Sequence, residues 1–254
     1  PTWGPSRPML EVEDLHVRYR RLRAVRGVSL TVGEGEIVCL VGPNGAGKSS
    51  TLRSIAGLHP PAQGDIRLAG RSVTGMAPET IARLGLSMVP EGRHVFTQLT
   101  VEENILLGSQ MRRDRKQVRA DFERMLESFP FLRGRLSTPG GKLSGGEQQQ
   151  LVIARALMTS PRLILLDEPS LGLAPMVVDT VYEILKGLRD EGITLLVVEQ
   201  STHRALENGD RIYIIRSGQI ELEGNCSELT DERVEQAYFG FGEADAEADG
   251  RTRF

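Results

Sequence analysis

Short apolar runs between turn signals dominate the first forty residues of the chain. Residues 10–41 alternate such runs with turns such as 32–35, which predicts several strands, some of them antiparallel. The run at 163–166 is apolar throughout, which is typical of a strand covered on both faces of a parallel sheet. The runs at 37–41 and 193–198 predict further buried strands.

Helical patterns alternate with these strands. Residues 49–58 predict a helix that Pro60-Pro61 ends, and residues 177–191 predict a helix between two of the buried strands. This alternation predicts an α/β fold with a mainly parallel sheet between helices. Further strands are predicted at 66–68 and 86–89, and a terminal hairpin around Ser217-Gly218 is predicted at 212–216 and 219–223.

The middle of the chain has a different pattern. Thr100 and Glu103 have the spacing of a capping box at the start of a helix. The charged stretch 110–128 and residues 145–158 predict two more helices, separated by a Pro/Gly-rich link at 138–141. We therefore predict a helical subdomain at about 92–160, inserted into the parallel sheet, beside an N-terminal antiparallel β subdomain.

The composition excludes few classes of protein. The 254 residues carry a formal net charge of −3, which gives no reason to expect nucleic acid as a partner. No apolar run approaches the roughly 20 residues of a membrane span, and residues 1–8 lack the apolar segment of a signal peptide. We therefore expect a cytoplasmic chain without a disulfide, with Cys39 buried in its strand and Cys226 in a polar loop. The acidic segment 241–254 is expected to be disordered.

A glycine-rich loop lies between the strand at 37–41 and the helix at 49–58. It fits the pattern G-x-x-x-x-G-K-S/T, in which backbone N–H groups and a helix N-terminus surround phosphate oxygens. Lys48 is expected to reach the β- and γ-phosphates, and the Ser49 hydroxyl is expected to bind Mg²⁺. The predicted nucleotide-binding residues of this segment are Gly42, Pro43, Asn44, Gly45, Ala46, Gly47, Lys48, Ser49 and Ser50.

Two carboxylates end the apolar strand at 163–166. Because ligands of open α/β sheets bind beyond the carboxyl ends of the strands, Asp167 and Glu168 are expected beside the phosphate loop. Asp167 is predicted to hold Mg²⁺, most simply through a water, and Glu168 to act as the general base for an attacking water. Such a reaction depends on positioning and charge, so no serine or cysteine nucleophile is needed.

The sequence Leu-Ser-Gly-Gly-Glu at 143–147 opens the helix predicted at 145–158. Ser144 and Glu147 are spaced as a capping box, and the two glycines leave the first N–H groups unshielded. This helix end is therefore suited to a phosphate, although the chain has only one phosphate loop. Either it is an ordinary capped helix, or it completes the nucleotide site of another copy.

These three segments occur in the order and spacing of ABC-type ATPases, and the chain resembles that family over about residues 8–240. The resemblance implies that two nucleotide domains pair head to tail with ATP between them. The phosphate loop of one domain would then face Ser144, Gly145 and Gly146 of the other. It also implies that Tyr19 stacks on adenine.

Three positions depart from the usual family pattern. Glu91 stands where a glutamine normally contacts Mg²⁺ and couples to the membrane partner, and Gln200 stands where a histidine normally touches the γ-phosphate. Glu91 can still ligate Mg²⁺, and Gln200 can donate the hydrogen bond but does not titrate. Ala174 replaces the usual aspartate, which weakens the expectation of a contact across the dimer there. His203 is expected to be a surface helix residue, with substitution for the missing histidine as the alternative.

With these departures the chain looks like the LivF-type ATP-binding subunits of branched-chain amino-acid importers. The resemblance implies an ATPase on the inner face of the cell membrane. Its partners would be membrane permease subunits, a second ATPase subunit (LivG-type, or another copy of this chain), and indirectly an external solute-binding protein. Importers of urea or short amides have similar patterns, so the solute stays open.

Two other functional classes of protein fit the sequence less well. The basic run at 112–116 would suit a soluble ABC ATPase that acts on nucleic acid or ribosomes, but a solvated helix face explains it more simply. A kinase or GTPase with a phosphate loop would leave the segment at 143–147 unexplained.

Overall fold

The computed structural model of the chain describes residues 8–240. The predicted disordered tail at 241–254 lies outside these residues. Among the described residues, none of the helices has both the length and the apolar character that crossing a bilayer requires.

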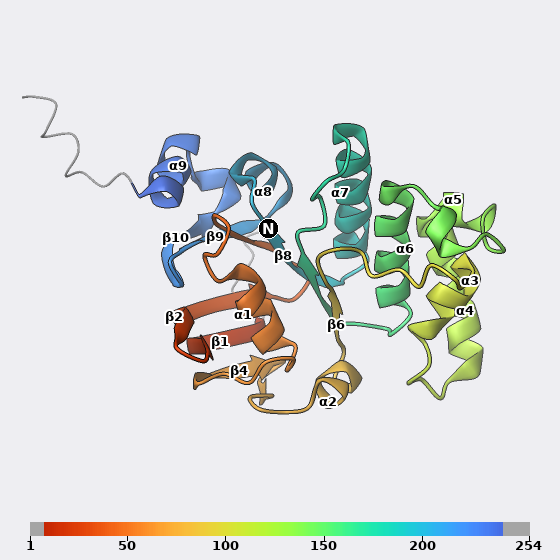
Figure 1. Cartoon of the computed structure of the whole chain (residues 1–254), viewed down its shortest axis with the longest axis horizontal. Coiled ribbons are helices and arrows are strands. Elements are labelled where there is room, and N and C mark those ends of the chain that lie inside the picture. Colours follow the sequence, from red (N-terminus) through yellow and green to blue (C-terminus); the bar gives the residue numbers. More distant parts are fainter. Residues whose placement is uncertain (1–7, 241–254) are drawn as a thin grey trace, which may run out of the picture.

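Two sheets form the framework (Figure 1). The larger has the strand order β10-β9-β3-β8-β7-β6, with β10 antiparallel to β9 and all other neighbours parallel. Its strands are β3 (Ile37–Val41), β6 (Leu86–Val89), β7 (Leu163–Asp167), β8 (Thr194–Glu199), β9 (Arg211–Arg216) and β10 (Gln219–Asn225). The smaller, antiparallel sheet has the order β2-β1-β4-β5, with β1 (Pro8–Tyr19), β2 (Leu22–Gly33), β4 (Gln63–Leu68) and β5 (Arg71–Ser72). The predicted α/β fold with an antiparallel β subdomain is confirmed.

Helices cover the larger sheet and extend it on one side. Between β6 and β7 the chain forms α3 (Val101–Leu107), α4 (Arg115–Ser128), α5 (Pro130–Arg133) and α6 (Gly145–Leu157), the helices that the sequence pattern places in an insertion. Figure 1 shows α3, α4 and α5 gathered at one end of the molecule, with α6 beside them. The remaining helices are α1 (Lys48–Ile55), α2 (Pro78–Arg83), α7 (Pro175–Asp190), α8 (Thr202–Asn208) and α9 (Asp231–Phe239).

The larger sheet separates two apolar cores. Successive side chains of a strand point to opposite faces, and β3 is buried at every position. Ile37, Cys39 and Val41 therefore pack with the helices of the insertion and of the C-terminal part of the chain. Val38 and Leu40 pack with the antiparallel sheet and α1. Burial on both faces fixes the position of β3 in the sheet. It therefore also fixes the point and the direction in which the next loop leaves the strand.

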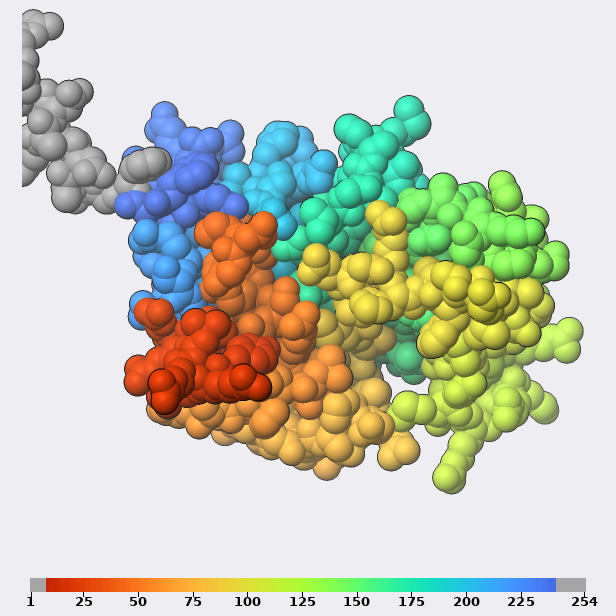
Figure 2. Space-filling model, viewed as in Figure 1, coloured from red at the N-terminus to blue at the C-terminus, as the bar shows by residue number. Residues whose placement is uncertain are grey.

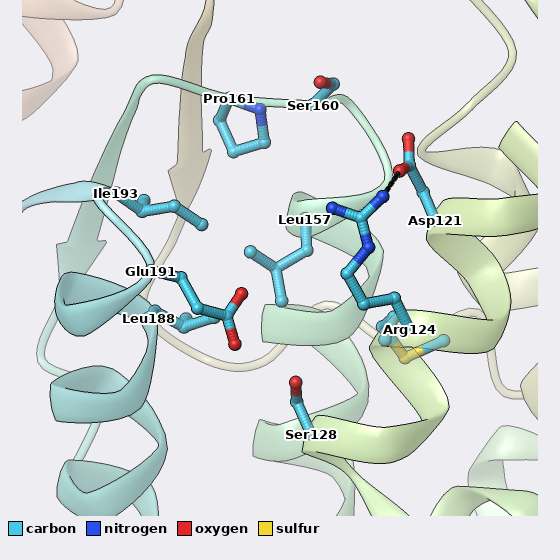
Figure 3. Close-up of a pocket in the computed structure, with 10 residues that line it drawn as sticks. Asp121, Arg124, Ser128, Leu157, Ser160, Pro161, Leu188, Glu191 and Ile193 are labelled. Carbon is cyan, nitrogen blue, oxygen red and sulfur yellow. Dashed lines mark hydrogen bonds and ion pairs between the residues drawn. The ribbon is translucent and has the colours of Figure 1, made fainter. Parts of the chain in front are cut away.

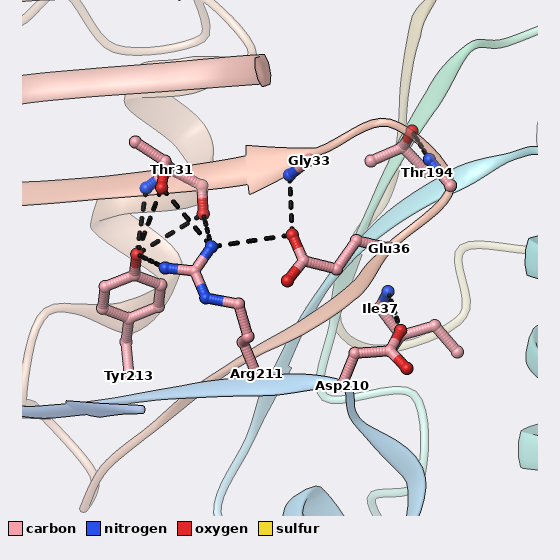
Figure 4. A network of polar contacts seen from close by, with 9 residues as sticks. Thr31, Gly33, Glu36, Ile37, Thr194, Asp210, Arg211 and Tyr213 are labelled. Carbon is pink, nitrogen blue, oxygen red and sulfur yellow. Dashed lines mark hydrogen bonds and ion pairs between the residues drawn. The ribbon is translucent and has the colours of Figure 1, made fainter. Parts of the chain in front are cut away.

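A polar network joins the two sheets at the end of β3 remote from that loop (Figure 4). Arg211 of β9 donates to the Tyr213 hydroxyl at 2.6 Å and pairs with Glu36 at 3.6 Å. The Thr31 N–H of β2 donates to the same hydroxyl at 3.2 Å. Asp210 accepts a hydrogen bond at 2.8 Å from the N–H of Ile37, the first residue of β3. These bonds anchor β3 where it starts and tie β2 to β9.

Three expectations about local structure are wrong. The helix predicted at 49–58 ends at Ile55, before the prolines. Its end is set by Gly57, which has φ of 73° and packs so closely that a Cβ would lie 2.7 Å from Ile81 Cδ1. The charged helix begins at Arg115 and not at residue 110. The carboxylate of Asp114, the residue before it, is bound by Arg112 and gives α4 no side-chain cap.

The third error concerns the second cysteine. Cys226 is buried, because it opens a short 3₁₀ turn against α8 with its Sγ 3.6 Å from the Ala205 carbonyl oxygen. Cys39 is buried in β3 as expected, and both thiols are free within the described residues. Burial raises the pKa of the Cys226 thiol to about 11 and that of Cys39 in the same direction, so both stay protonated near neutral pH.

A cavity of about 130 Å³ lies between α4 and the junction of α7 with β8 (Figure 3). Arg124 lies at its edge and pairs with Asp121 at 2.7 Å. Leu157 at the end of α6 and Leu188 of α7 contribute apolar walls. The cavity lies where the helical insertion meets the part of the chain that forms the larger sheet.

Candidate nucleotide site

The phosphate loop fills the gap between β3 and α1, and packing requires two of its glycines. A Cβ at Gly42 would overlap the Ile215 carbonyl oxygen, and a Cβ at Gly47 would lie 2.6 Å from the Ala24 carbonyl oxygen. Gly47 also has φ of 110° where it precedes α1, a conformation that other residues rarely adopt. Asn44 and Gly45 at the tip are exposed. The loop therefore presents its backbone to the solvent at the start of a helix, as phosphate binding requires.

Lys48 is the cation of the loop, and its side chain is only 4% exposed. Its Nζ donates to the carbonyl oxygens of Gly42 at 2.7 Å and Pro43 at 3.1 Å. The same ammonium lies 3.4 Å from Glu168 Oε1. A buried ammonium with this partner is a ready counter-charge for a phosphate that displaces the carboxylate.

Ser49 and Asp167 meet at 2.9 Å, where the Ser49 hydroxyl donates to Asp167 Oδ1. The other oxygen, Asp167 Oδ2, is buried and has no hydrogen-bond partner among residues 8–240. Burial raises the pKa of Asp167, and the bond from Ser49 opposes that rise. A hydroxyl and a carboxylate with an unused buried oxygen form an oxygen-ligand pair that fits Mg²⁺. No group of three or more His, Cys, Asp or Glu side chains arranged to hold a metal occurs among the described residues.

Glu168 follows Asp167 at the end of β7 and turns toward the phosphate loop. Its φ of 49° is unusual for a non-glycine residue, and its N–H donates to the Val198 carbonyl oxygen at 3.0 Å. Gln200, which follows β8, donates from Nε2 to Glu168 Oε2 at 2.6 Å. Lys48 and Gln200 thus hold the two oxygens of one carboxylate.

Lys48, Glu168 and Gln200 line a pocket of about 610 Å³, together with Glu91 and residues 44–50 of the phosphate loop and the start of α1. That volume lies in the usual range for a small-molecule site. In Figure 2 the orange segment of the phosphate loop and α1 is exposed on the viewed face, above the red β1–β2 hairpin. The pocket is therefore open to a ligand from solution.

Tyr19 also lines this pocket, at the end of β1. Its ring stacks on His59, with 4.3 Å between ring centroids. His59 does not line the pocket, and its Nε2 lies 2.9 Å from the Arg18 carbonyl oxygen. The Tyr19 hydroxyl is buried without a hydrogen-bond partner among the described residues. His59 is thus fixed by the backbone and supports one face of the Tyr19 ring.

The segment Ser144–Gly146 lies outside this pocket. Ser144 accepts a bond from the Glu147 N–H at 3.3 Å, and Glu147 accepts one from the Ser144 N–H at 2.7 Å, so the predicted capping box is confirmed. His203 is on the surface of α8, as predicted, with its side chain 73% exposed and 3.3 Å from Glu207. Ala174 precedes α7 and provides no side-chain cap.

The sequence did not reveal four other residues that line the pocket, namely Leu22, Ala24, Arg53 and Leu171. Leu22 and Ala24 belong to β2, which pairs with β1 beside Tyr19. A prediction of the register between these two strands could have located both residues at the pocket. Arg53 shares a face of α1 with Ser49, four residues earlier. No sequence pattern indicates the loop position of Leu171.

A family model described as "ABC transporter" matches residues 25–171. The high-affinity branched-chain amino acid transport ATP-binding protein BraG of Pseudomonas aeruginosa is 43% identical over 91% of this chain and 100% of its own length. A probable branched-chain amino acid transport ATP-binding protein, LivF, of Archaeoglobus fulgidus is 36% identical over 91% of this chain and 99% of its own. The lipopolysaccharide export system ATP-binding protein LptB of Escherichia coli is also 36% identical, over 91% and 97%.

Solved structures agree with the sequence comparisons. The ADP conformation of an ATP-binding cassette of an ABC transporter superimposes with a TM-score of 0.82 at 27% identity, covering 92% of this chain and 99% of that one. A dimeric bacterial ABC transporter cassette superimposes with a TM-score of 0.77 at 26% identity, covering 86% and 99%. With its nucleotide-site geometry, its sequence and its fold in agreement, the chain belongs to the ABC transporter family, as one of its ATP-binding subunits.

Proposed function

We propose that this chain is the ATP-hydrolysing subunit that energises a membrane importer for branched-chain amino acids. The observation that carries the proposal is the meeting of Lys48, Glu168 and Gln200 at one phosphate-loop pocket, with Asp167 bound to Ser49 of the same loop. The names of the relatives BraG and LivF support the class of solute. The sequence Pro-Glu-Gly-Arg at 90–93 supports the same subfamily.

In this proposal ATP occupies the 610 Å³ pocket. The backbone of residues 42–50 and the Lys48 ammonium bind the phosphates, and the free face of Tyr19 stacks on adenine. Ser49 and Asp167 hold Mg²⁺, with Glu91 as a third oxygen ligand. The metal supplies neutralisation of the phosphate charge when it is bound. The buried, unpaired Asp167 Oδ2 supports this assignment.

Hydrolysis would use Glu168 as general base for the attacking water. In the structure this carboxylate is engaged at both oxygens, by Lys48 at 3.4 Å and Gln200 at 2.6 Å. A bound triphosphate competes for Lys48, so one carboxylate oxygen becomes free to accept the proton of water. Gln200 then keeps the base oriented and lies within reach of the γ-phosphate. This exchange of partners couples the arrival of ATP to the exposure of the base.

The proposal includes a second nucleotide domain. Ser144, Gly145 and Gly146 are outside the chain's own pocket, and a helix N-terminus without an anion is suited to a phosphate that another subunit brings. Two domains would therefore pair head to tail around ATP, and release of the γ-phosphate would separate them. We favour a LivG-type partner over a second copy of this chain.

The remaining parts follow from the same assignment. Residues 8–240 would be the nucleotide domain and about 92–160 its helical subdomain, which with the Glu91 loop would contact the permease subunits. The chain would sit on the inner face of the cell membrane. A solute-binding protein on the other side would deliver the cargo. The exposed side chain of Phe96, 53% accessible, is an apolar group available for such a contact.

The basic run at 112–116 gives little support to a nucleic-acid partner. Arg112 is bound to Asp114 at 2.7 Å and also pairs with Asp121, so its charge is already neutralised. An importer of urea or short amides remains the main competing function, since the solute is selected by other subunits. LptB, at the same 36% identity as LivF, is named for an export system, which is why the solute needs a direct test.

The test is reconstitution of the chain with the permease subunits and solute-binding protein encoded beside it, in vesicles that contain ATP. Leucine is expected to stimulate ATP hydrolysis and to be taken up, while urea and acetamide are not. The Glu168→Gln chain serves as the inactive control. Stimulation by urea or acetamide instead of leucine would replace the solute, and a chain that fails to bind the permease subunits would refute the transport role.

A further inference from the structure

The loop that leaves β6 carries an arginine whose placement the nucleotide pocket does not explain. Arg93 lies two residues beyond Glu91, and its guanidinium rests against Gly145 at the start of α6. A Cβ at Gly145 would lie 2.8 Å from Arg93 Nη1 and 3.1 Å from its Cζ. Arg93 Nη2 donates a long hydrogen bond of 3.4 Å to the Gly172 carbonyl oxygen. The guanidinium thus sits where α6 begins and the loop before α7 passes.

The backbone holds Arg93 in this place at an energetic cost. Gly92, Arg93 and His94 have φ values of 86°, 66° and 49°, three left-handed residues in a row. Two of them are not glycine, and such conformations persist only where surrounding contacts enforce them. Arg155 of α6 supplies one such contact, because its Nη2 donates to the His94 carbonyl oxygen at 3.0 Å. Backbone strain maintained beside a proposed active site indicates a positional requirement.

The charge of Arg93 is not neutralised within the chain. No Asp or Glu carboxylate of residues 8–240 lies within 4.0 Å of its nitrogens, and its bond to Gly172 is long. The nearby N–H groups of Gly145 and Gly146 have no acceptor among the described residues either. The carboxylate of Glu147 is already used, by the Ser144 N–H at 2.7 Å and by Arg135 at 3.8 Å. A guanidinium without a carboxylate partner and the positive end of a helix therefore converge, and together they suit an anion.

The position of Arg93 relative to the chain's own nucleotide pocket indicates which phosphate it could bind. Arg93 is absent from the lining of that pocket and instead borders a neighbouring cavity of about 280 Å³, with Glu91, Gln149, Glu168 and Leu171. An anion brought by another subunit suits this position, because Arg93 lies against Gly145 of α6 and does not line the chain's own pocket.

We propose that Arg93 is a catalytic residue that acts in trans, by binding the γ-phosphate of the ATP held in the phosphate loop of the facing nucleotide domain. This inference rests on the head-to-tail pairing of the proposed function and adds a residue to it. The guanidinium can bind two phosphate oxygens side by side, which a lysine cannot do. During hydrolysis a water oxygen bonds to the γ-phosphorus, and the bond to the β-γ bridging oxygen breaks. Glu168 of the domain that holds this ATP takes the proton of the water. Arg93 stabilises the non-bridging oxygens and is unchanged.

The test measures association driven by ATP. Size-exclusion chromatography with light scattering follows the Glu168→Gln chain, alone and with the second ATP-binding subunit of the same transporter, in ATP and in ADP. Adding Arg93→Gln, which keeps a long polar stem, is expected to weaken the ATP-dependent association at least tenfold, and Arg93→Lys to an intermediate extent. Arg133→Ala is the matched control, because Arg133 is 55% exposed and pairs with Glu123 away from α6, and its effect is expected to stay within twofold.

Binding of a fluorescent ATP analogue by the monomer is the second readout. Arg93→Gln is expected to leave this affinity within twofold, since Arg93 does not line the chain's own pocket. Unchanged binding of the analogue would also show that the variant is folded. Weaker monomer binding would place Arg93 in its own site and overturn the trans role, as would undiminished association of the Arg93→Gln chain. If the Glu168→Gln chain associates with neither partner in ATP, the head-to-tail pairing itself falls, and the inference with it.

Discussion

Replacing Glu168 by Gln removes the proposed base with the smallest change in shape. A glutamine at 168 keeps an oxygen that can accept the 2.6 Å bond from Gln200, and it loses only the charge that faces Lys48. Lys48 retains two carbonyl acceptors at 2.7 and 3.1 Å. The loss in unfolding free energy is therefore expected to be about 1–2 kcal/mol, less than the full value of a charged hydrogen bond lost without compensation. A domain with the usual stability of about 5–15 kcal/mol stays folded.

The effect on turnover is expected to be much larger. A positioned general base contributes about 10²–10⁴-fold, or about 3–5 kcal/mol of activation free energy. Affinity for Mg·ATP should be unchanged or greater, because the phosphates no longer compete with a carboxylate for Lys48. Steady-state phosphate release and equilibrium binding of a fluorescent ATP analogue measure the two quantities on the same preparation. Turnover within about threefold of the unmodified chain would show that Glu168 is not the base.

Four other changes test the remaining parts of the site. Gln200→Ala should slow phosphate release less than loss of the base does, by about tenfold, because one hydrogen bond to the reacting groups is removed; an equal collapse would contradict this ranking. Asp167→Asn should weaken Mg²⁺-dependent ATP binding yet raise the melting temperature of the free chain. The pKa of that carboxyl is raised by folding from its ordinary value of 3.8, so its ionisation opposes folding and stability falls as pH rises through the interval above 3.8. Melting curves in which the Asn variant gains nothing near neutral pH would refute this sign. Tyr19→Phe should leave nucleotide affinity unchanged while Tyr19→Ala weakens it about tenfold, as measured by titration, since the ring and not the buried hydroxyl does the stacking. Gly42→Ala should lower the melting temperature sharply or prevent folding, whereas Gly187→Ala, with open space around its Cβ position, should be neutral or stabilising by up to about 1 kcal/mol; similar melting of both would show that the close approach at Gly42 is relieved cheaply.

The long strands and the motif segments were predictable because a strong local signal marks each of them. The apolar run of β7 fixes its place inside the sheet, and its carboxyl end then brings Asp167 and Glu168 to the phosphate loop. The capping box at Ser144 and Glu147 is a property of four consecutive residues. In these segments local sequence and tertiary placement require the same structure.

Other features depend on packing that no local pattern encodes. The helices α2 and α9 were not predicted, because they are short and draw their stability from packing against strands of the larger sheet. The stacking of Tyr19 on His59 joins residues forty positions apart. The left-handed conformation of Arg93 and His94 is equally hidden, since a sequence shows neither the strain nor the contacts that maintain it.

Helix α6 spans 13 residues from Gly145 to Leu157, which makes it a rigid rod of about 20 Å. One end carries the amides that we propose to face a phosphate, the other leads into β7 and the carboxylates, and α3 of the insertion packs along it. A tilt of about 10° about the far end would displace those amides by about 3 Å, well beyond the tolerance of a hydrogen bond. If two nucleotide domains pair as proposed, a partner that pushes on the insertion would therefore need only a small tilt of α6 to form or break the contact with the other domain's nucleotide. In such a motion α6 would pivot at its junction with β7.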